Sequence, residues 1–128
     1  MDTTLVDAFI AVLNRPDAVV TDGATLAGLG KDYWGFGENP GLLLRPRSSD
    51  EVVTVVRVAA AHKVSLVTRG GASNCSAGVM AGPDLVMLDL TGMNQILSVD
   101  SHARTARVQP GVINFDLQQK LAPHGLVF

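Results

Sequence analysis

The stretch SLVTRGGASNCSAG, residues 65–78, decides the fold, because a predicted strand passes directly into a glycine-rich loop. Apolar and β-branched residues from Ser65 to Thr68 are typical of a buried strand. The loop then runs from Arg69 to Gly82. Small residues let a backbone approach a ligand closely, and successive backbone N–H groups form an anion-binding nest. The loop therefore suits a diphosphate, although a flexible connection after a strand would have a similar composition.

A strand and a helix are predicted before this stretch. Leu42 to Leu44 is a short apolar run, as expected of a buried strand. Ser48 and Glu51 have capping-box spacing, so a helix should begin there, with the apolar residues between Val52 and Ala60 on one face. Strand, capped helix and strand make a βαβ unit with parallel strands. Ligands bind at the carboxyl ends of such strands, which is where the loop lies.

The remaining segments predict an α+β chain with three parts. Residues 4–14 form an amphipathic helix capped by Thr4, and the glycine-containing segment 21–41 is loop-like. A buried strand at 85–88 is followed by an antiparallel hairpin, 95–99 with 105–109, and a helix over 114–122. The predicted parts are a helix and loop (1–38), a small parallel βαβ subdomain (39–92) and the start of an antiparallel subdomain (93–128).

Composition excludes several classes of protein. Hydrophobic residues make up 47% of the 128, and ten basic against twelve acidic residues give a net charge of −2. This excludes intrinsic disorder and argues against nucleic-acid binding, which needs a cationic surface. No apolar run reaches the roughly 18 residues expected of a membrane span. A single cysteine excludes an internal disulfide framework and favours a reduced, cytoplasmic setting.

Few side chains outside the loop point to chemistry. The histidines match no metal-ligand spacing and are expected in turns and helix ends: His62, His102 and His124. Cys75 is either a small buried filler or a reactive thiol. Asp89 and Asp116 are expected to be structural, and Tyr33 and Trp34 either pack a long loop on the core or line a pocket. Pro110-Gly111 reads as a turn between a strand and a helix.

Taken in order, the motifs resemble one family. They are Leu43-Leu44-Arg45-Pro46-Arg47-Ser48, Asp50-Glu51-Val52, Arg69-Gly70-Gly71-Ala72-Ser73, Val86-Met87-Leu88-Asp89-Leu90, Met93-Asn94, Val108-Gln109-Pro110-Gly111-Val112 and Leu121-Ala122-Pro123-His124-Gly125-Leu126. Over about residues 32–128 the chain resembles the FAD-binding (PCMH-type) domain of the vanillyl-alcohol oxidase/p-cresol methylhydroxylase family. Within that family it is most similar to the branch of glycolate oxidase flavoprotein subunits and D-lactate dehydrogenases.

The resemblance implies a set of cofactor-binding residues. By this resemblance, the FAD diphosphate is expected to lie on the glycine-rich loop, and a glycine is expected to shape the far end of that loop. The proline-glycine turn is expected to approach the cofactor from the second subdomain. The residues so implied are Arg69, Gly70, Gly71, Ala72, Ser73, Asn74, Gly78, Pro110 and Gly111. Relatives with histidyl-linked flavin carry a histidine where this chain has Ser73, so the FAD is expected to be non-covalent there.

The resemblance also implies an activity for a longer protein. The expected role is the N-terminal FAD-binding portion of an oxidoreductase that oxidises a small 2-hydroxy acid of the glycolate or D-lactate type. The substrate would bind a C-terminal domain beyond this chain, so no catalytic residue can be assigned and the 128 residues alone should be inactive. Association with that remainder or with a second copy is expected to cover exposed apolar surface. The alternatives are a UDP-N-acetylenolpyruvylglucosamine reductase-like flavoprotein and a non-catalytic nucleotide-binding or assembly module.

Overall fold

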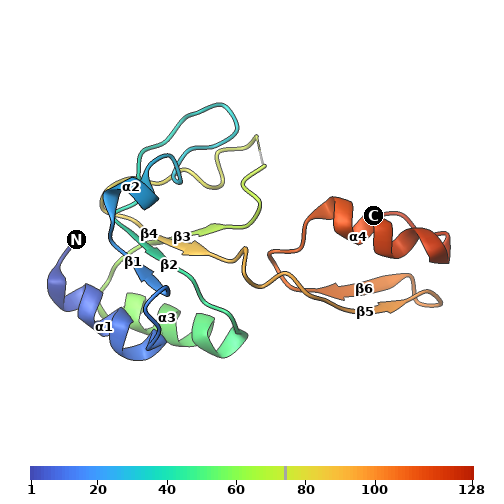
Figure 1. Ribbon diagram of the computed structural model, residues 1–128, viewed down its shortest axis with the longest axis horizontal. Helices are drawn as coiled ribbons and strands as arrows, with labels where there is room; N and C mark the ends of the chain where they lie inside the picture. Colours follow the sequence, from blue (N-terminus) through green and yellow to red (C-terminus); the bar gives the residue numbers. More distant parts are fainter. Residues whose placement is uncertain (74) are drawn as a thin grey trace.

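The computed structural model describes residues 1–73 and 75–128 (Figure 1). In these residues the chain forms a main sheet with helices on it and, beyond it, a hairpin with its own helix. The elements are α1 (Thr3–Leu13), β1 (Val19–Val20), α2 (Gly23–Leu26), β2 (Leu42–Leu44), α3 (Ser49–Ala61), β3 (Leu66–Arg69), β4 (Val86–Asp89), β5 (Ile96–Asp100), β6 (Thr105–Val108), α4 (Asn114–Leu121) and a 3₁₀ turn (Ala122–His124).

The main sheet has the strand order β1-β2-β4-β3. β2 and β3 both run parallel to β4, with Leu43 and Val67 in register with Met87, while β1 is antiparallel to β2. The predicted βαβ unit is therefore confirmed in strand direction. Its two strands are not neighbours, however, because β4 lies between them and pairs in parallel with both.

The two faces of the main sheet bury different sets of side chains. Alternate strand residues point to opposite faces. Leu42, Leu44, Val86 and Leu88 pack with Phe9 and Val55, so α1 and α3 cover one face. Leu43 and Met87 face the other way, where they pack with Leu26 of α2. All of the β2 residues are fully buried, as expected for a parallel strand covered on both faces.

Polar side chains cap the N-termini of α1 and α3, and one of the two predicted caps needs correction. Ser48 caps α3 as predicted, and its hydroxyl accepts a hydrogen bond of 3.2 Å from the Glu51 backbone N–H. The cap of α1 is Asp2 rather than the predicted Thr4, because the Asp2 carboxylate accepts from the Thr4 backbone N–H at 3.1 Å. Asp and Thr are both good N-caps, and the prediction chose Thr4 although the cap lies two residues earlier, at Asp2.

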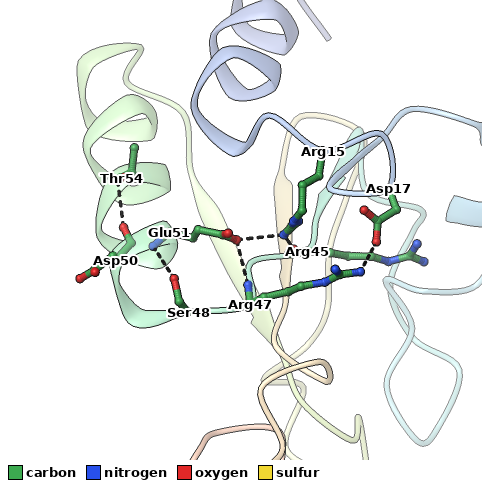
Figure 2. A network of polar contacts seen from close by, with 8 residues as sticks. All are labelled: Arg15, Asp17, Arg45, Arg47, Ser48, Asp50, Glu51 and Thr54. Carbon is green, nitrogen blue, oxygen red and sulfur yellow. Dashed lines mark hydrogen bonds and ion pairs between the residues drawn. The ribbon is translucent and has the colours of Figure 1, made fainter.

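The Glu51 side chain does not complete the capping box but turns toward two arginines (Figure 2). Its Oε2 accepts from the Arg15 guanidinium and from the Arg47 backbone N–H, both at 2.9 Å. Arg15 also donates to the Arg45 carbonyl at 2.8 Å. The segment after α1, the segment after β2 and the first turn of α3 are thereby joined around one carboxylate.

Two short elements in the N-terminal part were not predicted. β1 has two residues, and its pairing with β2 depends on tertiary contact rather than on a sequence pattern. The helix α2 lies in the segment predicted as loop. Asp22 caps it, and hydrogen bonds from the Thr25 backbone N–H and hydroxyl, both 2.8 Å, hold the pKa of the Asp22 carboxyl below its ordinary value.

The hairpin and α4 lie apart from the main sheet, at the end of the segment that follows β4 (Figure 1). β5 and β6 are antiparallel, as predicted, with Val99 opposite Ala106. All of β6 is exposed, and α4 buries Leu117 and Leu121. An open cavity of about 860 Å³ lies between β6, α4 and the C-terminal residues. No helix in the described parts of the chain is long and apolar enough to cross a membrane.

Candidate cofactor-binding site

The glycine-rich loop begins at the carboxyl edge of the main sheet, where the sequence predicts it. β3 ends at Arg69, in register with Asp89 at the end of β4. The Leu90 backbone N–H donates to the Arg69 carbonyl at 2.8 Å, so the two chain segments leave the sheet together. One becomes the glycine-rich loop, and the other leads to the hairpin. The site is thus built at the carboxyl ends of adjacent parallel strands.

The structure brings the glycine-rich loop against the proline-glycine turn, forty residues further along the chain. A Cβ placed on Gly70 would lie 3.3 Å from the Pro110 carbonyl oxygen, and one on Gly71 would lie 3.2 Å from Cδ1 of Ile113. Both contacts are tighter than ordinary van der Waals contacts. Glycine therefore allows a close approach of two motifs that the resemblance assigns to the same cofactor.

Gly111 fixes the position of the turn. Its backbone N–H donates to the Met93 carbonyl at 2.8 Å, and a Cβ on Gly111 would collide with the carbonyl oxygen of Leu90. Gly111 is buried, and the Gln109 backbone N–H donates to the Gln95 carbonyl at 2.9 Å. The turn is thus held at the base of the hairpin, next to the segment by which β4 leaves the main sheet.

Two alanines of the loop have left-handed backbone conformations. The φ angles are +53° at Ala72 and +60° at Ala77. This region is unfavourable for residues with a Cβ. Alternation of right- and left-handed residues turns successive N–H groups toward one side, which is how a nest binds an anion. Ser73 and Gly78 are exposed, and the predicted site residue Asn74 lies outside the described residues.

Arg69 has a contact that the sequence did not indicate. Its guanidinium donates to the carbonyl oxygen of Leu29 at 2.7 Å. Leu29 belongs to the long segment between α2 and β2, so this hydrogen bond ties that segment to the start of the glycine-rich loop. The sequence separation of forty residues and the use of a backbone acceptor explain why no motif could reveal it.

The other candidate side chains are not gathered at the site. The three histidines are exposed, and no group of His, Cys, Asp or Glu within residues 1–73 and 75–128 could hold a metal ion. Cys75 is an exposed free thiol rather than a buried filler. Asp89 accepts hydrogen bonds from Thr91 and lies 3.6 Å from the Arg45 guanidinium, in keeping with a structural role.

Tyr33 and Trp34 do not pack on the core, so one of their two expected roles is wrong. Their exposed fractions are 66% and 64%. The segment that carries them turns away from the sheet because its backbone hydrogen bonds are made within the segment and to the end of the glycine-rich loop. The sequence could not distinguish this arrangement from packing on the core, since both place large apolar rings in a glycine-containing loop.

Comparison with known proteins identifies the family. The family described as FAD binding domain matches residues 40–128. The chain belongs to this FAD-binding domain family. The match covers β2 to the C-terminal residues and includes both the glycine-rich loop and the proline-glycine turn. The cofactor of the family is FAD, and the fold is that of the PCMH-type domain expected from the sequence.

Several relatives are named as dehydrogenases or oxidases. The chain is 38% identical over 128 residues to D-2-hydroxyglutarate dehydrogenase of Stutzerimonas stutzeri, covering 99% of this chain and 27% of that protein. It is 34% identical over 89 residues to glycolate oxidase subunit GlcD of Bacillus subtilis, covering 70% of this chain and 19% of that protein. The chain thus spans about a quarter or less of the length of these relatives.

Solved structures give the same fold. An alkyldihydroxyacetonephosphate synthase superposes with a TM-score of 0.79 at 25% identity, covering 98% of this chain and 25% of that one. p-Cresol methylhydroxylase with substrate bound superposes with a TM-score of 0.73 at 25% identity, covering 96% of this chain and 25% of that one. The FAD-binding fold expected from the sequence is therefore confirmed over nearly the whole chain.

The residues present fit a diphosphate of this cofactor. Gly70 and Gly71 leave free the space that a Cβ would fill beside Pro110 and Ile113. Backbone N–H groups, rather than a metal or a lysine, are the donors that such a loop offers. The loop therefore offers backbone donors suited to a diphosphate next to the base of the hairpin.

Proposed function

We propose that this chain binds FAD non-covalently and forms the cofactor-binding portion of an oxidoreductase that oxidises a small 2-hydroxy acid. The observation that carries the proposal is the close approach of Gly70 and Gly71 to Pro110 and Ile113. Two motifs of the FAD-binding domain family meet there, at the carboxyl ends of β3 and β4. The residues proposed to line the cofactor are Arg69, Gly70, Gly71, Ala72, Ser73, Asn74, Gly78, Pro110 and Gly111.

This chain would place the cofactor rather than react with the substrate. Bound FAD supplies the hydride acceptor, while a protein positions and tunes it. In this proposal the glycine-rich loop holds the diphosphate through backbone N–H groups, and the turn at Gly111 closes the opposite side. Arg69 acts through its hydrogen bond to the Leu29 carbonyl, which steadies the start of the loop. Ser73 offers a hydroxyl in place of the histidine used for covalent attachment.

The substrate class is taken from the names of the relatives. D-2-hydroxyglutarate dehydrogenase, glycolate oxidase subunit GlcD and D-lactate dehydrogenase are all named for 2-hydroxy acids. These names favour a 2-hydroxy acid over the reaction of an enolpyruvylglucosamine reductase. The groups that bind the acid are proposed to lie in the three quarters of those proteins that this chain does not match. The proposed location is the cytoplasm, supported by the exposed free thiol of Cys75.

FAD binding to the chain tests the cofactor part of the proposal. Titration followed by flavin fluorescence should show saturable binding by the wild-type chain. Gly70→Val should abolish binding, because a branched side chain would occupy the space beside the Pro110 carbonyl. Gly92→Val is a matched control, since a Cβ on Gly92 meets nothing within 4 Å. Absence of FAD binding by a folded wild-type chain, or unchanged binding by Gly70→Val, would refute this cofactor site.

Flavin reduction tests the substrate part. The chain joined to the remainder of its own protein should lose flavin absorbance when D-2-hydroxyglutarate, glycolate or D-lactate is added without oxygen. The 128 residues with bound FAD should not respond to any of the three acids. Reduction by NADPH but by none of the acids would favour the reductase alternative. FAD binding without reduction in either form would favour a non-catalytic module.

A further inference from the structure

Three of the six aromatic residues of the chain lie within four positions, in a loop that presents them to solvent. We call residues 31–37 the aromatic loop. Tyr33, Trp34 and Phe36 are each about two-thirds exposed, at 66%, 64% and 65%. A cluster of exposed apolar side chains is typical of a surface that binds a ligand or another protein surface. The family match begins only at residue 40, so it assigns nothing to this loop.

The aromatic loop is held in shape by a buried carboxylate. Asp32 is only 9% exposed, and its Oδ1 accepts from the backbone N–H groups of Trp34 and Phe36 at 2.9 and 3.0 Å. The Asp32 backbone N–H also donates to the Phe36 carbonyl at 3.0 Å. The rings of Tyr33 and Trp34 meet edge to face, with centroids 5.2 Å apart. The aromatic side chains are therefore presented by a preorganised turn, which reduces the entropy lost on binding a ligand.

The aromatic loop is joined to both ends of the glycine-rich loop. At the near end, Arg69 donates to the Leu29 carbonyl at 2.7 Å. At the far end, the Glu38 backbone N–H donates to the Ala81 carbonyl at 3.0 Å, and the Ala81 N–H donates to the Gly30 carbonyl at 3.1 Å. Figure 1 shows the two loops side by side on the same side of the main sheet, away from α1 and α3.

We propose that the aromatic loop, with Trp34 foremost, contacts a planar ring of the dinucleotide held by the glycine-rich loop. This inference rests on the proposed function. FAD carries a flat ring system on each side of its diphosphate, and aromatic side chains stack on such rings whatever their hydrogen-bonding pattern. Stacking is the chemistry shared by adenine and by the flavin ring, and the experiment below separates the two. The hydrogen bonds to Ala81 and from Arg69 keep the stacking residues and the diphosphate loop in one rigid unit.

Trp34 reports on its own surroundings, because it is the only tryptophan of the chain. The flavin quenches tryptophan emission by energy transfer without contact, so the readouts are the emission maximum and protection from acrylamide. Addition of FAD should shift the emission of Trp34 to shorter wavelength and reduce its quenching by acrylamide. If ADP produces the change and FMN does not, the ring is adenine; if FMN alone produces it, the ring is the flavin.

Substitution gives a second readout. Trp34→Ala should weaken FAD binding by about fivefold to 150-fold, the range expected for loss of one stacked ring. Phe128→Ala is the matched control, because Phe128 is also an exposed ring, at 77%, but lies on the cavity beside α4. It should leave FAD binding unchanged. Circular dichroism should show that both variants keep the fold of the wild-type chain, since each removes a mostly exposed side chain.

The outcomes separate this inference from the proposed function. If the wild-type chain does not bind FAD, the proposed function fails. If it binds FAD, but Trp34 stays accessible to acrylamide and Trp34→Ala binds FAD as the wild type does, the proposed function stands and the role of the aromatic loop is refuted. An equal loss of FAD affinity in Trp34→Ala and Phe128→Ala would also refute it, because the effect would not be specific to the aromatic loop.

Discussion

The main sheet and the hairpin differ in the fraction of their residues that is buried. The residues of β2 are 0% exposed, and Val86, Met87 and Leu88 of β4 are at most 2% exposed, since helices or loops cover both faces of the main sheet. In the hairpin, by contrast, all of β6 is exposed. The first region therefore carries its own hydrophobic core, whereas the second gains little apolar burial from its own residues.

This difference matters because the candidate site uses both regions. The glycine-rich loop extends from the main sheet, while Pro110 and Gly111 stand at the base of the hairpin. The well-packed region supplies a fixed platform, and the sparsely packed one supplies the opposite wall. We therefore expect cofactor binding to require order in the hairpin base, to which the hydrogen bond from the Gly111 N–H to the Met93 carbonyl contributes.

The largest difference between the two regions should appear on removal of apolar side chains. Leu44→Ala should lower the free energy of unfolding by about 2–5 kcal/mol, because Leu44 is fully buried between β4 and the helices. Leu97→Ala in β5 should change it by at most about 0.5 kcal/mol, because Leu97 is 51% exposed. Urea denaturation measures both. Equal losses would show that the hairpin contributes to the core as much as the main sheet does.

The arginine–glutamate network should show the next largest effect. Glu51→Ala removes the acceptor of Arg15 and of the Arg47 backbone N–H, and the partly buried Arg15 loses its ion-pair partner (Figure 2). We expect a loss of about 1–3 kcal/mol in unfolding free energy. Asp50→Ala is the matched control, since Asp50 is an exposed acid in the same helical turn. A loss as large in Asp50→Ala would assign the effect to the helix dipole instead.

A smaller and local effect is expected in the hairpin. The Asp100 carboxylate accepts from the backbone N–H groups of His102 and Ala103 at 3.0 and 2.9 Å, and so shapes the turn between β5 and β6. Asp100→Ala should cost about 0.5–1.5 kcal/mol of local stability. Hydrogen exchange of β5 and β6 amides should become faster, while that of β2 and β4 stays unchanged. Faster exchange in β4 as well would show that the two regions unfold together.

The smallest expected effect is a dependence of the stability of α2 on pH. The Thr25 backbone N–H, and then its hydroxyl, hold the pKa of Asp22 below its ordinary value in the folded chain. The cap therefore stabilises α2 above the unfolded pKa of about 3.9, and this contribution is lost as the pH falls through the lower folded value. NMR titration of the Asp22 carboxyl should give a midpoint below that of an exposed aspartate. Asp22→Asn should remove this part of the acid sensitivity, and an unshifted midpoint would contradict the assignment.

Short-range patterns predicted much of the fold. The Leu42–Leu44 run, the cap at Ser48 and the alternation around the hairpin turn each depend on a few adjacent residues. Strand order cannot be predicted from such short-range patterns, because it depends on which strand lies between two others in the folded sheet. Nothing in Val86 to Asp89 indicates that β4 pairs with both β2 and β3. β1 and α2 are too short to give a periodic pattern.

The site was predictable in its motifs but not in its contacts. The sequence singled out Gly70 and Pro110 separately, and the structure adds that they lie next to each other. The hydrogen bond from Arg69 to Leu29 and the exposure of Trp34 could not be predicted, because both depend on the path of the segment between α2 and β2. Which of the assigned residues bind FAD stays a prediction until binding is measured.

The central place of β4 has a consequence for how the chain folds. β2 and β3 have no hydrogen bonds to each other, so neither can complete its parallel pairing until residues 86–89 are present. During synthesis, the apolar strands at 42–44 and 66–69 leave the ribosome before their shared partner does. Non-local pairing of this kind slows folding and leaves strand edges exposed in the meantime. We therefore expect the nascent chain to be more prone to aggregation before β4 is synthesised than afterwards.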